Sequence, residues 1–394
     1  MSGFAIQSIV LKVAAPCNLN CSYCYEYNRG DSSWRSKPKH ILPEVVSRLG
    51  ERIGEYAALR GLASFQINLH GGEPMLLGFD GIERVIEALR ASAPSVGIRF
   101  GMQTNATLAN DEMVYVLRKH QVRVGVSLDG DMRANRLRVD HRGNGTWERT
   151  VAGLRRLREA GLVSGIQAVI DLDSDPEAVL DALGEFQPPL IELSQPFGNY
   201  DNPPSTGGSR HTLGEWLSRA FDHWERSPAL RGIRVGILAD ALRATMTERP
   251  ASEWFPGVPQ GFIVVATDGS YEGLDALKIV GAEGRVLGRS VHSHSIAEAL
   301  EHEFIALRSG GSKLCDECSA CPISSWCAGG YFPTRYGRGH GFDNPSVYCE
   351  DLKRLFAHLG GWLAAQDAID EASRLRINGR LAKLTVHESG VVRD

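Results

Sequence analysis

The stretch Cys17-Asn18-Leu19-Asn20-Cys21-Ser22-Tyr23-Cys24-Tyr25 follows directly on an apolar, strand-like segment and places three cysteines in one short loop. Iron–sulfur cubanes are held by cysteine thiolates and usually take four of them. Three thiolates therefore leave one iron free to bind something other than protein. The loop predicts a metal centre with an open position, while a zinc site or a structural cysteine cluster remain alternatives on spacing alone.

The composition of the whole chain narrows the class of protein. Its 394 residues are 43% hydrophobic and 23% charged, as expected of a globular protein of two or three domains. The net charge of -4 offers no basic field for nucleic acid or an anionic membrane. The longest apolar runs, such as 261–266, are too short to span a bilayer. We expect no nucleic-acid partner and no membrane span.

The distribution of the cysteines predicts the compartment. Three of the eight lie at 17–24 and five at 315–349, with none between, which is typical of metal ligation in a reducing environment rather than of a disulfide framework. The N-terminal stretch Phe4 to Pro16 contains Lys12 and lacks a basic n-region, so it does not resemble a secretory signal. We predict a cytoplasmic protein whose first strand begins there.

Apolar runs alternate with helical patterns from residue 6 to about 200. This alternation predicts an α/β protein with parallel strands, either a barrel or a doubly wound sheet, and six strands favour a partial (β/α)6 TIM-like barrel. A helix is predicted over Thr146 to Ala160, with Thr146 as its N-cap. Another is predicted over Leu213 to Glu225, and a β-hairpin over Val264 to Ile279. The predicted strands are Ile6–Val13, Phe65–His70, Ile98–Gln103, Val122–Leu128, Ser164–Leu172 and Leu190–Pro196.

Polar or glycine-rich residues end several of these strands. The carboxyl ends of parallel barrel strands form the active site, so these residues are the first candidates for function. The glycines let the backbone approach a ligand closely, and Glu73 can accept hydrogen bonds from an ammonium. Each motif taken alone is equally well explained as a turn or a strand-end cap. The motifs are Gly71-Gly72-Glu73, Gln103-Thr104-Asn105 and Ser127-Leu128-Asp129-Gly130, the last followed by Arg138.

In this order, the three-cysteine loop and the strand-end motifs resemble the radical SAM superfamily over the first 200 residues. The resemblance implies that Cys17, Cys21 and Cys24 hold a 4Fe-4S cluster. Its free iron would bind S-adenosylmethionine, which is cleaved to a 5'-deoxyadenosyl radical. Arg142 is an alternative to Arg138 as the cofactor-binding arginine, because the spacing of that loop varies within the superfamily. The resemblance assigns cofactor binding to Tyr25, Gly71, Gly72, Glu73, Asn105, Ser127 and Arg138.

The second group of cysteines resembles a SPASM domain, the auxiliary-cluster module of radical SAM enzymes that act on peptides and proteins. Tyr331 stands where that pattern has a further cysteine, and Asp268 to Asp275 resembles a segment that normally carries another ligand but has none here. The resemblance implies one auxiliary 4Fe-4S cluster, with zinc as the alternative, and leaves Cys315 unassigned. Its ligands are Cys318, Cys321, Cys327 and Cys349.

Asp275 is the candidate catalytic residue. It matches an aspartate that relatives place in the substrate pocket, where it takes a proton from the substrate. A salt bridge to Lys278 is the plainer alternative. The predicted domains are a radical SAM partial barrel at 1–200, a helical linker at 201–255, a SPASM-like domain at 256–372 and a C-terminal tail at 373–394.

Further segments resemble the branch of SPASM peptide maturases that form cyclophanes. That branch joins an aromatic ring carbon to the β-carbon of a residue two positions later in a ribosomal precursor peptide. Thioether formation, epimerisation, formylglycine formation on a sulfatase, and an iron–sulfur redox protein without turnover remain alternatives. Expected partners are the precursor peptide, a small leader-binding protein, and an electron donor such as flavodoxin or ferredoxin. The segments are Asp31-Ser32-Ser33-Trp34, Pro196-Phe197-Gly198-Asn199 and residues 341–349.

Overall fold

The computed structural model describes residues 5–204, 209–257, 261–281, 286–302 and 314–385, and these divide into two compact units. The first unit comprises residues 1–167 and 261–307, and the second comprises 168–260 and 308–394. The chain thus leaves the first unit, builds part of the second, and returns. Among the described residues, no helix combines the length and the hydropathy that crossing a membrane requires.

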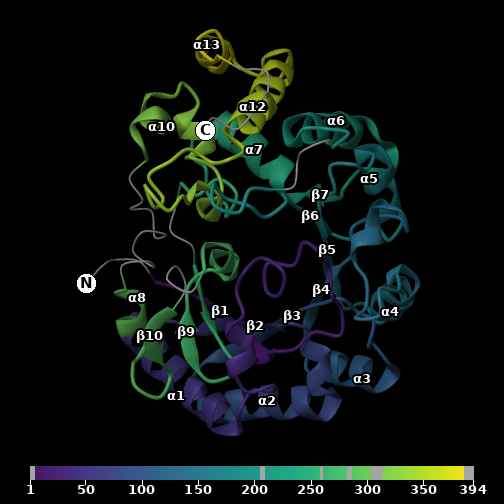
Figure 1. The fold of residues 1–394 in the computed structure, drawn as a ribbon, viewed down its shortest axis with the longest axis vertical. Coiled ribbons are helices and arrows are strands. Elements are labelled where there is room, and N and C mark those ends of the chain that lie inside the picture. The colour runs from purple at the N-terminus through teal and green to yellow at the C-terminus, as the bar shows by residue number, and fades with distance from the viewer. Residues whose placement is uncertain (1–4, 205–208, 258–260, 282–285, 303–313, 386–394) are drawn as a thin grey trace. The chain divides into compact units, whose positions relative to one another are not determined.

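A parallel sheet forms the core of the first unit, as the alternating pattern predicts (Figure 1). Neighbouring strands along the chain are also neighbours in the sheet, with parallel pairing from β1 through β5. Ile9, Leu11 and Val13 of β1 are fully buried, as expected of a parallel strand covered on both faces. The strands are β1 (Ser8–Ala14), β2 (Ser64–Gly71), β3 (Gly97–Thr104), β4 (Arg123–Ser127) and β5 (Val163–Val169).

Helices follow the strands in the manner of βα units. The Pro at the first turn of α1 suits a position whose N–H has no partner within the helix. Helix α4 begins where the sequence predicts, but the Thr146 side chain does not cap it. Thr146 is the N-cap residue by position, as predicted, but its hydroxyl donates to the carbonyl of Arg138 at 2.8 Å instead of accepting from the helix. The helices are α1 (Pro43–Arg60), α2 (Phe79–Ser92), α3 (Asp111–Lys119) and α4 (Trp147–Glu159).

The returning segment completes the first unit next to β1. Strand β8 (Phe262–Val265) pairs in parallel with β1, and β9 (Ser270–Glu272) turns back against β8. The predicted hairpin is therefore present, but its second strand ends at Glu272 and a 3₁₀ helix, η5 (Asp275–Val280), replaces the rest. Strand β10 (Val286–Ser290) and helix α8 (Ile296–Leu300) follow.

The compact units divide the chain differently from the predicted domains. The predicted SPASM-like range begins at 256, yet the described residues that follow, from β8 onward, belong to the first unit, where β8 is hydrogen-bonded to β1. The predicted tail from 373 also contains most of a helix, α13 (Glu371–Leu381), whose N-cap Asp370 accepts a hydrogen bond from Ser373 N–H.

Helices dominate the second unit, where β6 (Leu190–Ser194) pairs in parallel with the short β7 (Arg234–Val235). The predicted helix over Leu213 to Glu225 is α6, and Trp216 and Phe221 on it are buried. Phe221 packs edge-on against Trp362 at 5.2 Å between ring centroids. The helices are α5 (Pro176–Gly184), α6 (Leu213–Arg226), α7 (Gly236–Thr247), α10 (Asp316–Ala320), α11 (Ser324–Cys327), α12 (Cys349–Ala364) and α13.

Glu192 on β6 makes the stability of the second unit depend on pH. Burial raises its pKa from the ordinary 4.5 to about 7, although Trp254 Nε1 donates to Oε1 at 2.6 Å. Because folding raises this pKa, the folded state binds more protons and stability falls as the pH rises from 4.5 to 7, by up to about 3 kcal/mol. Glu192→Gln should remove most of that fall in urea midpoints measured across this range. An equal fall in the wild type and the variant would contradict the prediction.

Candidate metal centre and cofactor site

The three-thiol loop begins where β1 ends. The Leu19 N–H donates to Cys17 Sγ at 3.4 Å, and Cys24 N–H donates to the carbonyl of Cys21 at 3.0 Å. In a tetrahedral zinc site the sulfurs lie about 3.8 Å apart, since each Zn–S bond is about 2.3 Å. No three cysteine sulfurs of the described residues lie within 4.8 Å of one another. The predicted cluster and the zinc alternative both stay predictions for this loop.

The two glycines after β2 bring the chain against this loop. Gly72 N–H donates to the carbonyl of Ala14 at 2.9 Å, and Glu73 N–H donates to that of Pro16 at 3.1 Å. A Cβ on Gly71, whose φ is +140°, would lie 2.0 Å from the Ala14 oxygen. The backbone at Gly71 and Gly72 thus lies close to the chain that leads into the cysteine loop. Their contact with a ligand stays a prediction.

Glu73 is buried, with 1% of its surface exposed, and its carboxylate is hydrogen-bonded within the protein. Oε1 accepts from Met75 N–H at 2.9 Å and from the Thr104 hydroxyl at 2.7 Å, while Oε2 accepts from Asn105 N–H at 2.8 Å. These bonds tie the turn after β2 to the end of β3. Acceptance of a ligand's ammonium by Glu73 stays a prediction that no contact here tests.

Asn105 connects the end of β3 to the three-thiol loop. Its amide nitrogen donates to Asn18 Oδ1 at 2.9 Å and lies 3.9 Å from Cys17 Sγ. Asn18 donates in turn to the Thr107 hydroxyl at 2.8 Å. Sequence reasoning missed Asn18 and Thr107. The position of Asn18 directly after the first cysteine is the one signal that could have indicated it.

Arg138 lies at the other side of the loop, buried and paired with Asp129. Its Nη2 and Nε lie 3.0 and 2.9 Å from the two carboxylate oxygens, and the Tyr23 hydroxyl donates to the same carboxylate at 2.5 Å. Arg138 also hydrogen-bonds the Cys21 thiol. Its rival Arg142 is exposed. Asp129 belongs to the strand-end motif quoted above, but its pairing with Arg138 was not predicted from the sequence.

Ser127 and Tyr25 have different surroundings. The Ser127 hydroxyl accepts from Gln103 Nε2 at 2.7 Å, which joins the ends of β4 and β3. Burial, together with the carboxylates of Asp275 and Glu26, raises the pKa of the Tyr25 phenol. Tyr25 therefore lies near the candidate catalytic aspartate. The cofactor roles of both residues stay predictions.

Asp275 belongs to a buried group of alternating charges. Lys12 Nζ lies 2.9 Å from Asp275 Oδ1, 2.8 Å from Glu26 Oε2 and 3.9 Å from Glu272 Oε2. The alternative of a salt bridge to Lys278 named the wrong partner, because Lys278 forms its ion pair with Glu26. We call Lys12, Glu26, Glu272, Asp275 and Lys278 the buried charge cluster.

The cluster keeps Asp275 ionised. Burial alone would raise its pKa, but the charges of Lys12, Lys278 and His70 outweigh burial and hold the pKa below the ordinary range of an aspartate. The pKa of Lys12 shifts in the opposite direction, upward. Burial disfavours its charge, yet Asp275, Glu26 and Glu272 raise its pKa well above the usual value.

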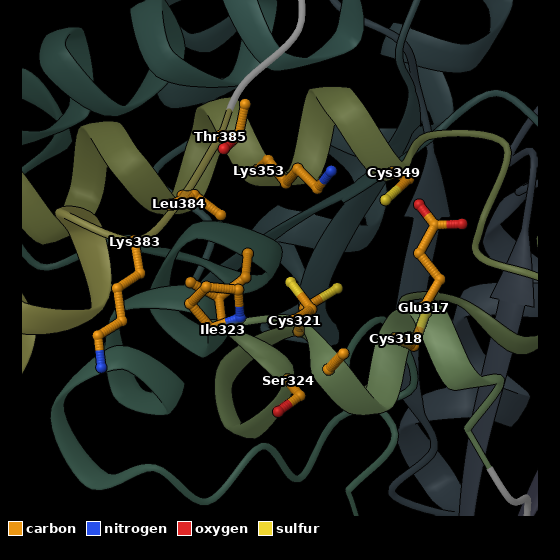
Figure 2. Close-up of a pocket in the computed structure, with 14 residues that line it drawn as sticks. Glu317, Cys318, Cys321, Ile323, Ser324, Cys349, Lys353, Lys383, Leu384 and Thr385 are labelled. Carbon is orange, nitrogen blue, oxygen red and sulfur yellow. The ribbon is translucent and has the colours of Figure 1, made fainter.

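Four of the five C-terminal cysteines line a second site, in the second unit. A cavity of about 240 Å³ is lined by the four predicted auxiliary ligands together with Glu317 and Lys353. Figure 2 shows Cys318, Cys321 and Cys349 around this cavity. Cys315 is buried and hydrogen-bonds the Cys318 thiol. Tyr331, in the place of a further cysteine, donates its hydroxyl to Glu253 at 2.8 Å.

The three-thiol loop at the end of β1 and the polar strand ends around it form the site predicted for the first cluster. Residues 12–183 match the family model of the Radical SAM superfamily. The matched segment is less than half of the chain. It agrees with the predicted superfamily over those residues, with the partial-barrel fold and with the predicted cofactors, 4Fe-4S iron–sulfur and S-adenosylmethionine. The roles of individual residues and the number of auxiliary clusters stay predictions.

Two curated relatives show sequence similarity. An uncharacterized protein of Methanocaldococcus jannaschii is 28% identical over 165 residues, which are 42% of this chain and 53% of that protein, so the match spans about half of the relative. A serine-type anaerobic sulfatase-maturating enzyme of Klebsiella aerogenes is 27% identical over 337 residues, covering 82% of this chain and 78% of the relative.

Two solved structures share the fold. Native anSMEcpe with bound AdoMet and Cp18Cys peptide superposes with a TM-score of 0.78 at 20% identity, covering 90% of this chain and 97% of the other. Streptococcus suis SuiB bound to precursor peptide SuiA superposes with a TM-score of 0.61 at 15% identity, covering 88% and 76%.

Proposed function

We propose that this enzyme oxidises a ribosomal precursor peptide by joining an aromatic ring carbon to the β-carbon of a residue two positions later. The observation that carries the proposal is the presence of two separate cysteine sites, the open three-thiol loop and the four-thiol cavity. Such a crosslink removes two hydrogens from the peptide. One leaves as a hydrogen atom, and the other leaves as a proton and an electron, so a radical source and an electron acceptor are both needed.

The first site supplies the radical. Cys17, Cys21 and Cys24 hold the first cluster, and bound S-adenosylmethionine supplies a carbon radical that removes a hydrogen atom from the substrate. Asn105 steadies the loop through Asn18. Arg138 and Asp129 form a charged, hydrogen-bonded wall beside Cys21. This pair would hold the part of the loop that carries Cys21 in place when the cluster is bound.

Asp275 takes the proton. A carboxylate with a lowered pKa is a weak base, so it suits a proton that is itself strongly acidic. The proton lost when an oxidised ring regains its aromaticity is of this kind. Lys12 keeps the carboxylate charged and fixes its position at 2.9 Å. Cys318, Cys321, Cys327 and Cys349 would hold the auxiliary cluster, which when bound would supply an acceptor for the electron released in the same step.

Formylglycine formation on a sulfatase is the second candidate. It is favoured by the sulfatase-maturating relative, whose similarity extends over 82% of this chain. It removes two hydrogens from a serine and therefore uses the same radical, base and electron acceptor. A small leader-binding protein and an electron donor such as flavodoxin or ferredoxin complete the proposed system.

The product distinguishes the two candidates. The anaerobically reconstituted enzyme, with S-adenosylmethionine and a reductant, is incubated with the precursor peptide encoded beside its gene and, separately, with a serine-containing sulfatase peptide. We expect loss of two hydrogens from the precursor, no fragmentation between the joined residues in tandem mass spectrometry, and no reaction with a hydrazine. An aldehyde trapped on the sulfatase peptide alone would replace the first candidate by the second. An unchanged mass with deuterium taken from solvent would indicate epimerisation and contradict both.

A further inference from the structure

A hollow of about 340 Å³ lies within the second unit, where α6 ends and β7 begins. The 3₁₀ helix η4 (Pro228–Leu230) connects these two elements. Leu230 and Ile233 in the lining are buried, and Trp224 is held in place because its Nε1 donates to the carbonyl of Ile233 at 2.9 Å. Ligand sites usually have volumes of about 300–1,000 Å³. The hollow is therefore large enough for a short ligand segment and offers it apolar contacts.

Positive charge dominates the lining of this hollow. It contains Arg226, Arg231 and Arg234 against one acid, Glu225, and all four residues are exposed. Arg234 is already paired with Asp240. In the part of the chain that the structure describes, neither Arg226 nor Arg231 forms an ion pair, and Arg226 uses only its Nε, which donates to a carbonyl of its own helix at 2.8 Å. Their terminal nitrogens are available to carboxylates, which the planar guanidinium binds well.

The end of α6 adds hydrogen-bond acceptors to the same hollow. Among the described residues, no backbone N–H donates to the carbonyls of residues 224–226, which line it. Pro228, the next donor position in the helical series, has no N–H to offer. A helix C-terminus carries partial negative charge, so it favours N–H donors and disfavours a bare anion such as phosphate. A ligand with both carboxylates and N–H groups suits this lining, and an acidic peptide has both.

We propose that this hollow binds an acidic segment in the leader of the precursor peptide, with Arg226 and Arg231 holding its carboxylates. The inference rests on the proposed function, because the precursor peptide is the substrate proposed above. Glu225 repels the same segment and so limits its affinity. The ring of Trp224 packs against the aliphatic parts of the segment. The site binds the peptide and takes no part in the chemistry.

The test measures binding to the reconstituted full-length protein without reductant, so that it does not depend on radical chemistry. Fluorescence anisotropy follows a fluorescein-labelled hexaglutamate peptide, its neutral hexaglutamine counterpart, and the labelled precursor peptide encoded beside the gene. Arg226→Gln and Arg231→Gln each remove one positive charge, and Glu225→Gln removes the repulsion. The matched control carries Arg155→Gln and Arg158→Gln on α4, which removes two exposed arginines outside the hollow.

We expect the wild type to bind hexaglutamate and the precursor, but not hexaglutamine. The dissociation constant should rise about threefold in each arginine variant and about tenfold in the double variant, since each exposed charge contact contributes modestly. It should fall about threefold in Glu225→Gln, rise with added salt, and stay unchanged in the α4 control. With the precursor as substrate, the arginine variants should raise KM and leave kcat unchanged, because the contact is the same before and during the reaction.

Several results would overturn the inference. They are failure of the wild type to bind hexaglutamate or the precursor, equal affinity of the wild type and the arginine double variant, and an equal loss in the α4 control, which would assign binding to net charge. A crosslinked precursor whose KM ignores both arginines would likewise overturn the inference and leave the proposed function intact. A precursor that binds through these arginines but is not modified would overturn the proposed function and leave an acidic-peptide site in place.

Discussion

Replacement of Lys12 by methionine is expected to abolish turnover and to destabilise the protein by about 3–5 kcal/mol, because it leaves the buried carboxylate of Asp275 without its ion-pair partner. Lys12 is only 4% exposed and contacts Glu26, Asp275 and Glu272 together. Methionine keeps the length of the side chain, so the loss reports the charge rather than a cavity. Urea unfolding of the reconstituted protein and the rate of product formation measure the two effects.

The same variant should change the dependence on pH. Because folding lowers the pKa of Asp275, its contribution to stability is complete above the ordinary pKa of an aspartate and is lost as the pH falls below it. Without Lys12 that pKa rises, so the loss should begin at a higher pH. Any residual activity should likewise fall away at a higher pH than in the wild type.

Lys37→Met is the matched control for Lys12→Met. Lys37 pairs with Glu272 at 2.6 Å from a more exposed position, and no ion pair joins it to Asp275 among the described contacts. Its loss should therefore cost about 1 kcal/mol and leave turnover largely intact. Equal activity of Lys12→Met and the wild type would refute the role given to Lys12. Equal damage from both variants would assign the effect to Glu272 instead of Asp275.

Gly72→Ala should empty the first cluster site. Its new Cβ would lie 1.8 Å from the Tyr27 hydroxyl and 2.4 Å from the Pro16 carbonyl oxygen, so the backbone that leads into Cys17 must move. We expect the iron content to fall by about four per chain while the auxiliary cluster remains. Iron analysis and the yield of 5'-deoxyadenosine test this expectation.

Two further variants test whether the steric clash at Gly72 causes the expected loss of iron. Gly54→Ala in α1 adds a methyl group where no atom lies within 4 Å, and should leave iron and stability unchanged or slightly improved. Tyr27→Phe combined with Gly72→Ala removes the nearest clashing oxygen but not the Pro16 backbone, so rescue should be partial. Full iron in Gly72→Ala alone would contradict the fit deduced between the turn after β2 and the cysteine loop.

The sequence predicts the barrel strands well because each is buried on both faces and bounded by polar turns. The run Ile98–Gln103 and the observed strand Gly97–Thr104 differ by one residue at each end. The returning hairpin was less accurate, since the apolar residues of Asp275–Val280 are buried in a 3₁₀ helix as fully as they would be in a strand. Hydrophobicity alone does not separate these two cases.

Some features of the candidate site can likewise be predicted from the sequence, and others cannot. Cys17, Cys21 and Cys24 can be recognised from their spacing, because all three lie in one loop. The pairing of Lys12 with Asp275 joins residues 263 positions apart and leaves no periodic signal, so only the pairing of β8 with β1 explains why the two meet. The partners of Glu73 and Arg138 belong to the strand-end motifs that the sequence shows, but the pairings themselves could not be predicted, since which polar groups meet at strand ends leaves no periodic pattern.

The pairing of β1 with β8 also determines how late in synthesis this part of the fold can be completed. In that pair Ser8 faces Phe262, which is synthesised 254 residues later. At about 5–20 residues per second, a ribosome needs roughly 10–50 s to deliver the second strand. Throughout that interval the strand that leads into the three-thiol loop has one unpaired edge, and Lys12 has no Asp275 to meet. The nascent chain therefore depends on protection of this edge, and the buried charge cluster can close only after two thirds of the protein has been made.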